Sequence, residues 1–284
     1  MSIIHILRKA FMGGFWTVWY PHRDEKIYRE VKTPEGTWIA DPFVYEENGE
    51  HYLFAEVFVK DRNKGVIGYF RFIDGEPVYQ GIAIEQSYHM SYPCIFQYQG
   101  SYFMIPETSA NKTIEMYHAE HFPDKWVLDT VLQKGEKWVD TTVRFQEGNP
   151  QLFTYRRASR EWRLTQYNLD MSKRKITAAN EVRYHANSGR PAGFFFGEKN
   201  NLRPAQNCIR MYGEEIIVYE MDSIMPYLEH ESYRIPVSRI ATERKYDRIH
   251  TINSDSAYDV VDVRKDRLDL LQGIKTLIRV YMTR

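Results

Sequence analysis

The stretch from Thr37 to Phe58, "TWIADPFVYEENGEHYLFAEVF", joins two apolar segments through a polar turn. Aromatic and β-branched residues dominate both segments, and Asn48-Gly49 between them is typical of a tight hairpin. The stretch therefore predicts two antiparallel strands. Each predicted strand carries one acid, Asp41 in the first and Glu56 in the second. A carboxylate in an apolar strand needs a partner or a function, because its burial is costly.

The same unit of strand, turn and strand recurs along the chain. It returns as "SYPCIFQYQGSYFMIPE", "VDTTVRFQEGNPQLFTY" and "RPAGFFFGEKNNLRPAQ", and in weaker form as "HTINSDSAYDVVDV". The residues that lead the five units lie 51, 48, 50 and 60 positions apart, and they are Asp41, Tyr92, Asp140, Arg190 and His250. This spacing is close to the length of a four-stranded propeller blade.

We therefore expect an all-β chain that forms a single five-bladed β-propeller domain over residues 1–284. The blades should occupy roughly residues 31–265, with an N-terminal segment 1–30 packed on them. Further hairpin turns are expected at Asp74-Gly75, Gln99-Gly100 and Tyr212-Gly213. Since the first strand of each blade lines the channel of a propeller, the five lead residues should face one funnel.

The end of the chain differs from the rest. In "RLDLLQGIKTLIRVYMTR", apolar residues recur at helical spacing with basic residues between them. We expect a short amphipathic helix over residues 266–284. It either docks on the propeller or rests on a membrane surface, where it would also meet a glycosyltransferase partner.

Composition excludes several functions. Lys and Arg total 38, as do Asp and Glu, so no net field attracts nucleic acid and we expect no such partner. Cys94 and Cys208 are far apart and should be reduced and unpaired. The N-terminal apolar residues are interrupted by His5, Arg8 and Lys9. This pattern is not that of a secretory signal, and we expect a cytoplasmic protein, or one peripheral at the inner membrane face.

The ordered motifs "ADPF", "YLFAE", "HMSYPCIF", "YFMIPET", "DTTVRF", "RPAGFFF", "LRPAQ" and "HTIN" together resemble a known family. It is the N-terminal domain of the glucosamine inositolphosphorylceramide transferases, and the resemblance extends over about residues 38–263. It implies a five-bladed propeller distantly similar to glycoside hydrolase family 43. In the plant proteins of the family, a separate C-terminal domain is the recognised glycosyltransferase.

Family 43 enzymes are inverting hydrolases with three acids: a base, a proton donor and a residue that tunes the donor. The resemblance implies that Asp41 is the base and Asp140 the tuning residue. The donor normally lies further along the propeller, where this chain reads "LRPAQ" with Arg203 and Gln206 and no carboxylate. Glu107 and Glu56 remain as candidate acids, and simple hydrolysis is less favoured.

The chemistry of the acids supports two interpretations of each. Asp41 either activates a water or hydroxyl group as a base or accepts backbone N–H groups. Glu107 either donates a proton, with its pKa raised by burial, or pairs with a basic residue. Asp140 either faces the pocket or caps a strand. For Glu56 we favour an ion pair with Arg190 or Arg203.

The remaining candidates are expected to bind substrate. Arg190 and Arg203 have the donor geometry for an anionic ligand, such as a nucleotide sugar or an anionic glycan, although pairing with the acids is equally expected. Aromatic and polar residues near the lead positions would contact the sugar; these are Trp38, His89, Tyr92, Gln206 and His250. No sequence motif indicates a metal or another cofactor, and none is expected.

Three functions follow from these expectations. The first is a carbohydrate-active enzyme, a glycosyltransferase or an inverting glycoside hydrolase-like protein, with Asp41, Glu107 and Asp140 as catalytic residues. It would perform transfer, cleavage or phosphorolysis at an anomeric carbon in the assembly of intracellular glycans or polysaccharides. The second is a non-catalytic glycan-binding or scaffolding propeller. The third is assembly with a glycosyltransferase at a membrane through the C-terminal helix.

Overall fold

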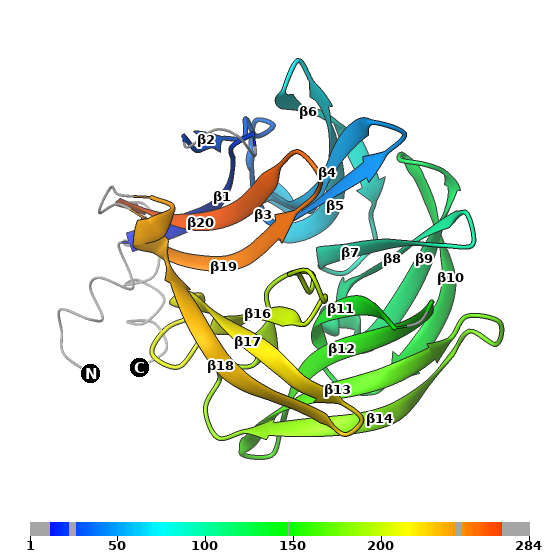
Figure 1. Ribbon diagram of the computed structural model, residues 1–284. Coiled ribbons are helices and arrows are strands. Elements are labelled where there is room, and N and C mark those ends of the chain that lie inside the picture. Colours follow the sequence, from blue (N-terminus) through cyan, green and yellow to red (C-terminus); the bar gives the residue numbers. More distant parts are fainter. Residues whose placement is uncertain (1–11, 23–26, 147, 242–245, 269–284) are drawn as a thin grey trace, which may run out of the picture.

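The computed structural model describes residues 12–22, 27–146, 148–241 and 246–268. These residues form five antiparallel sheets of four strands each, arranged around a common centre (Figure 1). The predicted all-β five-bladed propeller is confirmed. We number the blades in chain order.

The strands of each blade are antiparallel neighbours from the centre outward. Blade 1 contains β3 (Thr37–Glu47), β4 (Glu50–Val59), β5 (Lys64–Ile73) and β6 (Glu76–Ile84). Blade 2 contains β7 (Ser91–Tyr98), β8 (Ser101–Thr108), β9 (Thr113–His121) and β10 (Lys125–Lys134). Blade 3 contains β11 (Val139–Gln146), β12 (Asn149–Ala158), β13 (Glu161–Asp170) and β14 (Lys175–Tyr184). Blade 4 contains β15 (Arg190–Pro191), β16 (Leu202–Asn207), β17 (Glu215–Ile224) and β18 (Tyr227–Pro236).

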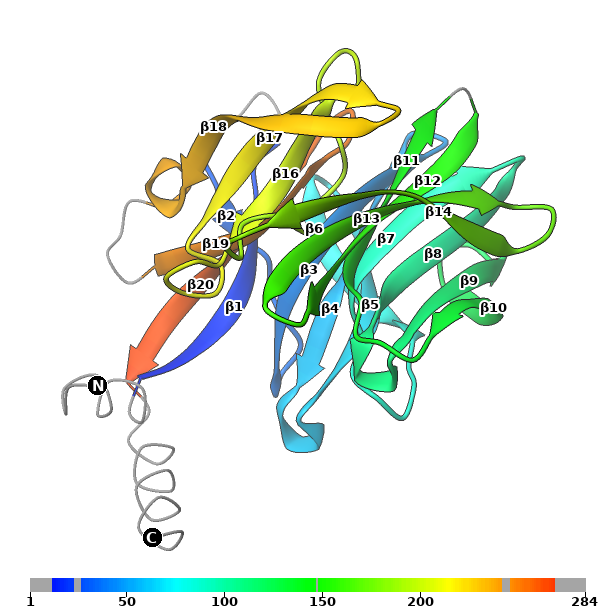
Figure 2. The ribbon, with the colours of Figure 1, turned by 90° about the horizontal axis from the view of Figure 1, so that it is seen from below.

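The fifth blade differs from expectation because the two ends of the described chain build it together. Its strand order is β19 (Tyr246–Ser254), β20 (Asp259–Leu268), β1 (Met12–Tyr20) and β2 (Arg29–Glu30). β1 pairs with β20 from Met12↔Leu268 to Trp19↔Val261, and Figure 2 shows the two strands side by side. The N-terminal segment is therefore part of a blade and closes the ring, so the predicted blade boundary at residue 31 is wrong.

The expected C-terminal helix is not supported. Residues 266–268 belong to β20, and the remaining residues of that prediction, 269–284, lie outside the described residues. Helical structure in the described chain is limited to three short 3-10 turns, at Lys60–Arg62, Ser109–Asn111 and Val237–Arg239. Within these described ranges, no helix has the length and apolarity needed to span a membrane.

Three of the predicted hairpin turns are confirmed. Asn48-Gly49, Asp74-Gly75 and Gln99-Gly100 each have two consecutive residues with φ between 49° and 80°. This left-handed backbone is the geometry of a type I′ turn, which suits the twist of the flanking strands. Tyr212-Gly213 lies instead in a longer connection between β16 and β17.

A bulge recurs at the start of the innermost strands and explains why the lead residues share one phase. The register slips by one residue between Ala40 and Phe43, and again at the matching positions of blades 2, 3 and 5. Asp41, Tyr92 and Asp140 sit in these bulges with φ of 50°, 47° and 49°. A bulge bends its strand and re-aims a side chain, and here it does so at the same height in successive blades.

Blade 4 is the exception. Arg190 pairs with Gln206 as Ala40 pairs with Glu56, so Pro191 rather than Arg190 occupies the bulge position. Proline cannot adopt the positive φ of the other lead residues, and this strand has no bulge. β15 ends after Pro191, and residues 192–201 form a loop whose Gly193 and Phe194 contact Tyr92 and Phe43.

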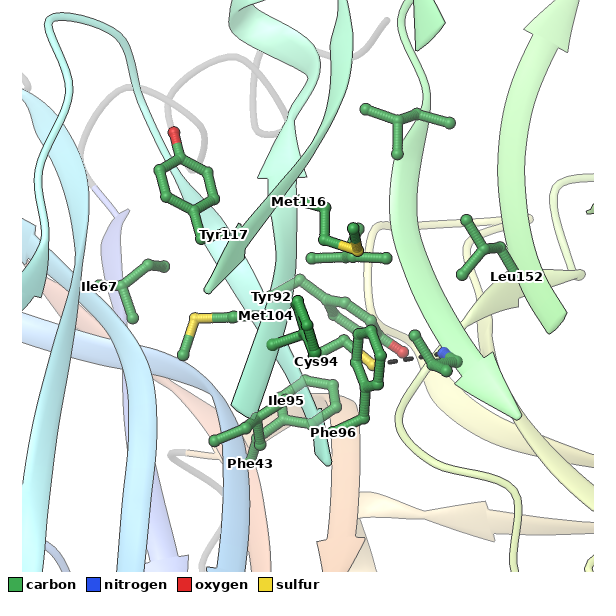
Figure 3. Packing of buried hydrophobic residues seen from close by; sticks show 14 of the residues in the cluster. Phe43, Ile67, Tyr92, Cys94, Ile95, Phe96, Met104, Met116, Tyr117 and Leu152 are labelled. Carbon is green, nitrogen blue, oxygen red and sulfur yellow. Dashed lines mark hydrogen bonds between the residues drawn. The ribbon is translucent and has the colours of Figure 1, made fainter. Parts of the chain in front are cut away.

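The apolar core lies between neighbouring blades. The largest cluster joins blades 1, 2 and 3, and Figure 3 shows Phe43, Tyr92, Cys94 and Leu152 packed within it. The Cys94 thiol accepts a hydrogen bond from the backbone N–H of Val143 at 3.3 Å. Both cysteines are free, as expected.

Candidate functional site

Five carboxyl groups gather at the end of the propeller where the innermost strands begin. We call them the acidic cluster: Asp41, Glu56, Glu107, Asp140 and Asp262. All are buried or nearly so, with Asp41 at 4% and Asp140 at 1% exposure. Glu56 and Glu107 occupy the same position on the second strands of blades 1 and 2, opposite Ala40 and Ser91. Such crowding cannot leave every carboxyl ionised, because like charges in a poorly solvated site repel.

Arg190 is the cation at the centre of this cluster. Its guanidinium group donates through Nε and Nη2 to the two oxygens of Asp140, and Nη2 also reaches Glu107 Oε2 at 3.2 Å. Asp140 further accepts a hydrogen bond of 2.6 Å from Gln206 Nε2. Gln206 is fully buried behind Asp140 and also donates to the backbone of Pro191. The structure therefore gives Gln206 a role in positioning Asp140 and not the expected contact with substrate.

Two acids of the cluster differ in protonation. Burial, followed by the neighbouring Asp140, raises the pKa of Glu107 to about 8, although Arg190 acts in the opposite direction. The bidentate contact with Asp140 already balances the positive charge of Arg190. Arg190 therefore offers Glu107 little net charge to stabilise its ionised form. Burial also raises the pKa of Asp41, but only to about 6, because His250 and the hydroxyl of Thr251 favour its ionised form.

Asp41 belongs to a network at the join of blades 1 and 5. Its Oδ1 accepts from Thr251 Oγ1 at 2.8 Å, and its backbone N–H donates to Asp262 Oδ2 at 2.8 Å. His250 Nδ1 lies 2.6 Å from Asp262 Oδ2. Burial alone would lower the pKa of His250, but Asp262 and Asp41 outweigh it and raise that pKa.

His250 does not face the solvent as a sugar ligand would. The indole ring of Trp16, from β1, stacks on the imidazole with ring centroids 3.7 Å apart. Asp41, His250 and Asp262 also bring their ligand-type atoms within 4.8 Å of one another, a spacing suited to a cation. The same atoms are engaged in the hydrogen bonds just described, so the geometry does not require a metal. The absence of a metal stays a prediction.

Glu56 does not pair with an arginine, so the expected ion pair with Arg190 or Arg203 is wrong. Its nearest basic side chain is His89, whose Nε2 lies 3.4 Å from Glu56 Oε1. His89 Nδ1 accepts from the backbone N–H of Gly65 at 2.9 Å, which leaves the proton of a neutral ring on Nε2. Burial raises the pKa of Glu56 well above its usual range and lowers that of His89. Burial therefore favours the neutral form of both groups.

Arg203 is not at the centre at all. It is completely buried inside blade 4, where it pairs with Glu229 at 2.6 Å and donates to the backbone oxygen of Gly189. Arg203 holds the pKa of Glu229 below its usual range against the effect of burial. The expected pair of arginines for an anionic ligand therefore does not exist, because one is a structural ion-pair partner within its own blade.

Tyr92 and Trp38 also differ from expectation. Tyr92 is fully buried, and its hydroxyl accepts from Gly193 N at 2.7 Å and lies 2.7 Å from Thr142 Oγ1. It plugs the channel below the acidic cluster and cannot stack on a sugar. Trp38 is half-buried and stacks on Phe58 with centroids 4.5 Å apart, near His89.

Sequence reasoning missed Asp262 and Tyr212. Asp262 lies in "YDVVDV", an acid in an apolar strand, which is the same signal that singled out Glu56. Tyr212 is 40% exposed, and its ring lies 5.2 Å from the Arg190 guanidinium carbon and at right angles to His250. Its turn sequence does not indicate this position, because the place of Tyr212 depends on how the connection between β16 and β17 folds in the tertiary structure.

The centre is more closed than the open funnel expected from the sequence. Exposure of the side chain falls from 36% at His89 to 20% at Arg190 and 10% at Glu107. Asp41, Asp140 and Asp262 are more buried still, with side-chain exposures of 6%, 1% and 0%. A ligand therefore meets His89, Arg190 and Tyr212 first, and reaches the deeper acids between them.

Five four-stranded blades surround a buried acidic cluster, so the chain has a five-bladed propeller fold with carboxyl groups gathered at its centre. Solved structures share this fold. They include an α-L-arabinanase of Cellvibrio cellulosa in complex with arabinohexaose, which has a TM-score of 0.56, 12% identity and coverage of 81% of this chain and 90% of its own. A family 117 glycoside hydrolase from Zobellia galactanivorans has a TM-score of 0.57, 11% identity and coverage of 90% and 92%.

Sequence comparison identifies the family. The chain belongs to the family described as glucosamine inositolphosphorylceramide transferase 1, N-terminal, whose model matches residues 26–265. It is 28% identical over 253 residues to glucosamine inositolphosphorylceramide transferase 1 of Arabidopsis thaliana, and 28% identical over 226 residues to that of Oryza sativa subsp. indica. These alignments cover 82% and 74% of this chain but only 31% and 29% of the two relatives.

Proposed function

We propose that this propeller binds a carbohydrate over the acidic cluster and acts at its anomeric centre, by transfer or cleavage of a glycosidic bond. The observation that carries the proposal is the contrast between Glu107 and Asp41. At pH 7 a carboxyl group with a pKa of about 8 retains its proton, whereas one with a pKa of about 6 is mostly ionised. Two titratable groups whose environments separate their pKa values are the pattern of an acid and base pair.

In this mechanism Glu107 protonates the leaving oxygen, and Asp41 accepts a proton from the attacking hydroxyl or water. Asp140 acts through Arg190, because its carboxylate fixes the guanidinium that contacts Glu107. Thr251 and Asp262 hold the side chain and the backbone of Asp41 in place.

The charge balance indicates the kind of sugar. Arg190 is bonded to Asp140 and Glu107, and Arg203 is held inside blade 4 by Glu229, so neither arginine is free to bind an anionic ligand. We therefore favour a neutral or amine-bearing sugar over the nucleotide sugar or anionic glycan expected from sequence. The word glucosamine in the relatives' name agrees with an amine-bearing sugar.

The proposal is tested with aryl glycosides, including aryl glucosaminides, and with nucleotide sugars plus an acceptor. Asp41→Asn should lower kcat by roughly 10²- to 10⁴-fold and leave the fold and the binding of the sugar intact. Glu107→Gln should also lower turnover, but activity should return on substrates whose leaving group needs no proton. If the wild type turns over these substrates and neither Asp41→Asn nor Glu107→Gln changes the rate, the assignment of Asp41 and Glu107 as base and acid is wrong. The exposed Glu198→Gln serves as a control.

A non-catalytic glycan-binding module is the second candidate, and two observations favour it. Gln206 stands where the resemblance places the proton donor, and the ion pairs of Arg190 cover the deeper acids. This function predicts that sugar binds to the wild-type protein without turnover, and that Asp41→Asn changes neither result.

A further inference from the structure

A pocket lies at the other end of the channel from the acidic cluster. Its walls come from residues 44–46, 95–97 and 143–145 of three innermost strands, together with residues 194–195, Asn200 and residues 254–255. Its volume is about 480 Å³, which is within the range of sites that bind small molecules. We call it the basal pocket. Along blade 1 it begins three residues beyond Asp41, roughly 10 Å at the rise of a β-strand.

A plug of tightly packed residues separates the two ends. Phe43 contacts both Tyr92 and Phe194, with ring centroids 4.8 and 4.9 Å apart. The hydroxyl groups of Tyr92 and Thr142 both bond to the backbone of Gly193. A ligand of the basal pocket would therefore not share the acidic cluster.

The basal pocket contains a buried cation, Arg144, that no acid of the described residues pairs with. Arg144 is 8% exposed, its Nε donates to the backbone oxygen of Asn200 at 3.0 Å, and its guanidinium group lies 5.6 Å from the centre of the Phe195 ring. Its Nη1 is buried and has no hydrogen-bond partner. Burial lowers the pKa of Arg144. Among the residues that the structure describes, no acid lies within ion-pair distance of it.

The acids on the wall of the pocket are already engaged. Asp255 lies 2.7 Å from His51 Nδ1 and accepts from the backbone N–H groups of Ala257 and Tyr258. Glu46 accepts from the hydroxyl of Ser256. Neither compensates Arg144. A buried guanidinium group needs an acceptor that matches its fork of donors, and a carboxylate or phosphate provides one.

The rest of the pocket suits a ring. Tyr45, Phe145 and Phe194 come from blades 1, 3 and 4, are only partly buried, and line it together. Aromatic faces of this kind pack against the apolar face of a sugar or another ring. From this arrangement we propose that the basal pocket binds a small ring-bearing anion, whose carboxylate or phosphate group accepts hydrogen bonds from Arg144.

Calorimetric titration with glucuronate and with glucose 6-phosphate tests the proposal, with glucose as the uncharged probe. At least one anion should bind, and glucose should bind at least 10-fold more weakly, because the charge-assisted bonds to Arg144 are worth roughly one to two orders of magnitude in affinity. Preference between the two probes identifies a carboxylate or a phosphate ligand. If neither anion binds at concentrations up to about 10 mM, the proposal is wrong.

Variants locate the site. Arg144→Met should weaken binding roughly 10- to 100-fold, whereas Arg157→Met, at an exposed arginine of the same blade, should have no effect. Asp41→Asn should bind the anion as the wild type does. Loss of binding in Asp41→Asn, or full binding in Arg144→Met, would place the anion elsewhere and overturn the proposal.

A separate variant guards against misfolding. Ser254 is exposed on the pocket wall, so Ser254→Glu adds a competing carboxylate there and leaves Arg144 in place. Binding of the anion should be lost in the folded Ser254→Glu protein, and unchanged affinity would contradict the proposed position. Without ligand, Arg144→Met should be at least as stable as the wild type, because it removes a buried charge that has no partner.

Discussion

Replacing Glu107 with glutamine tests the central electrostatic inference through stability, without any knowledge of the substrate. The amide of glutamine has the shape of a protonated carboxyl group and can still donate toward Asp140 and accept from Arg190. In the wild type, burial and Asp140 raise the pKa of Glu107 from 4.5 to about 8. If this pKa shift is realised in full, it changes the unfolding free energy by about 5 kcal/mol. Because Glu107 lies among other charged groups that respond when it titrates, we expect about 2 to 5 kcal/mol.

The direction of the effect follows from where protons are bound. Below pH 4.5 the carboxyl group is protonated in the folded and the unfolded protein alike. As pH rises toward 8, the unfolded chain releases this proton while the folded protein retains it, so the unfolding free energy of the wild type falls. Glu107→Gln lacks this loss, and its stability relative to the wild type should increase by the stated amount over this window.

Urea unfolding of both proteins between about pH 5 and pH 9 measures the difference. The exposed Glu198→Gln is the matched control and should follow the wild type at every pH. Parallel curves for the wild type and Glu107→Gln would show that Glu107 is an ordinary ionised partner of Arg190. It would then not be the proton donor.

Three further predictions concern other parts of the molecule. The value of kcat/KM should rise as Asp41 ionises near pH 6 and fall as Glu107 loses its proton near pH 8. A flat pH profile would show that neither group takes part in the reaction. Asp41→Asn should lower kcat by roughly 10²- to 10⁴-fold. Tyr92→Phe leaves the buried N–H of Gly193 without its acceptor and should cost about 1 to 3 kcal/mol in urea unfolding with the sugar affinity unchanged; an altered affinity would contradict its role as a plug. Arg203→Met leaves a buried acid unpaired and should cost about 3 to 5 kcal/mol; a loss of sugar binding in the folded variant would instead return Arg203 to the site.

The acids show how far local sequence predicts a site. Asp41, Glu107 and Asp140 were chosen because they stand at one phase of a repeat or interrupt an apolar strand, and the structure brings all three to one cluster. Asp262 carries the same signal and was missed, because its unit is the weakest of the five. The partner of Glu56 was mistaken, since a sequence does not say which basic group a buried acid will meet.

The two arginines illustrate the limit. "GRPAG" and "LRPAQ" look alike, with arginine before proline in each. Arg190 starts the first strand of its blade and points to the centre, whereas Arg203 lies on the second strand and turns into the interior of the blade toward Glu229. Which face of a sheet a residue occupies depends on the register, and register is decided when the strands pair.

Repeats, hairpin turns and aromatic strands are local properties, so the sequence alone determined that the chain is all-β and that its units form five blades. The tertiary structure decided what no local pattern contains. It paired β1 with β20 to close the ring, gave three lead residues a left-handed bulge that proline denied to blade 4, and left Arg144 buried with no acid of the described chain beside it. Each of these depends on contacts between residues far apart in the chain, and such contacts exist only after the blades have packed around one another.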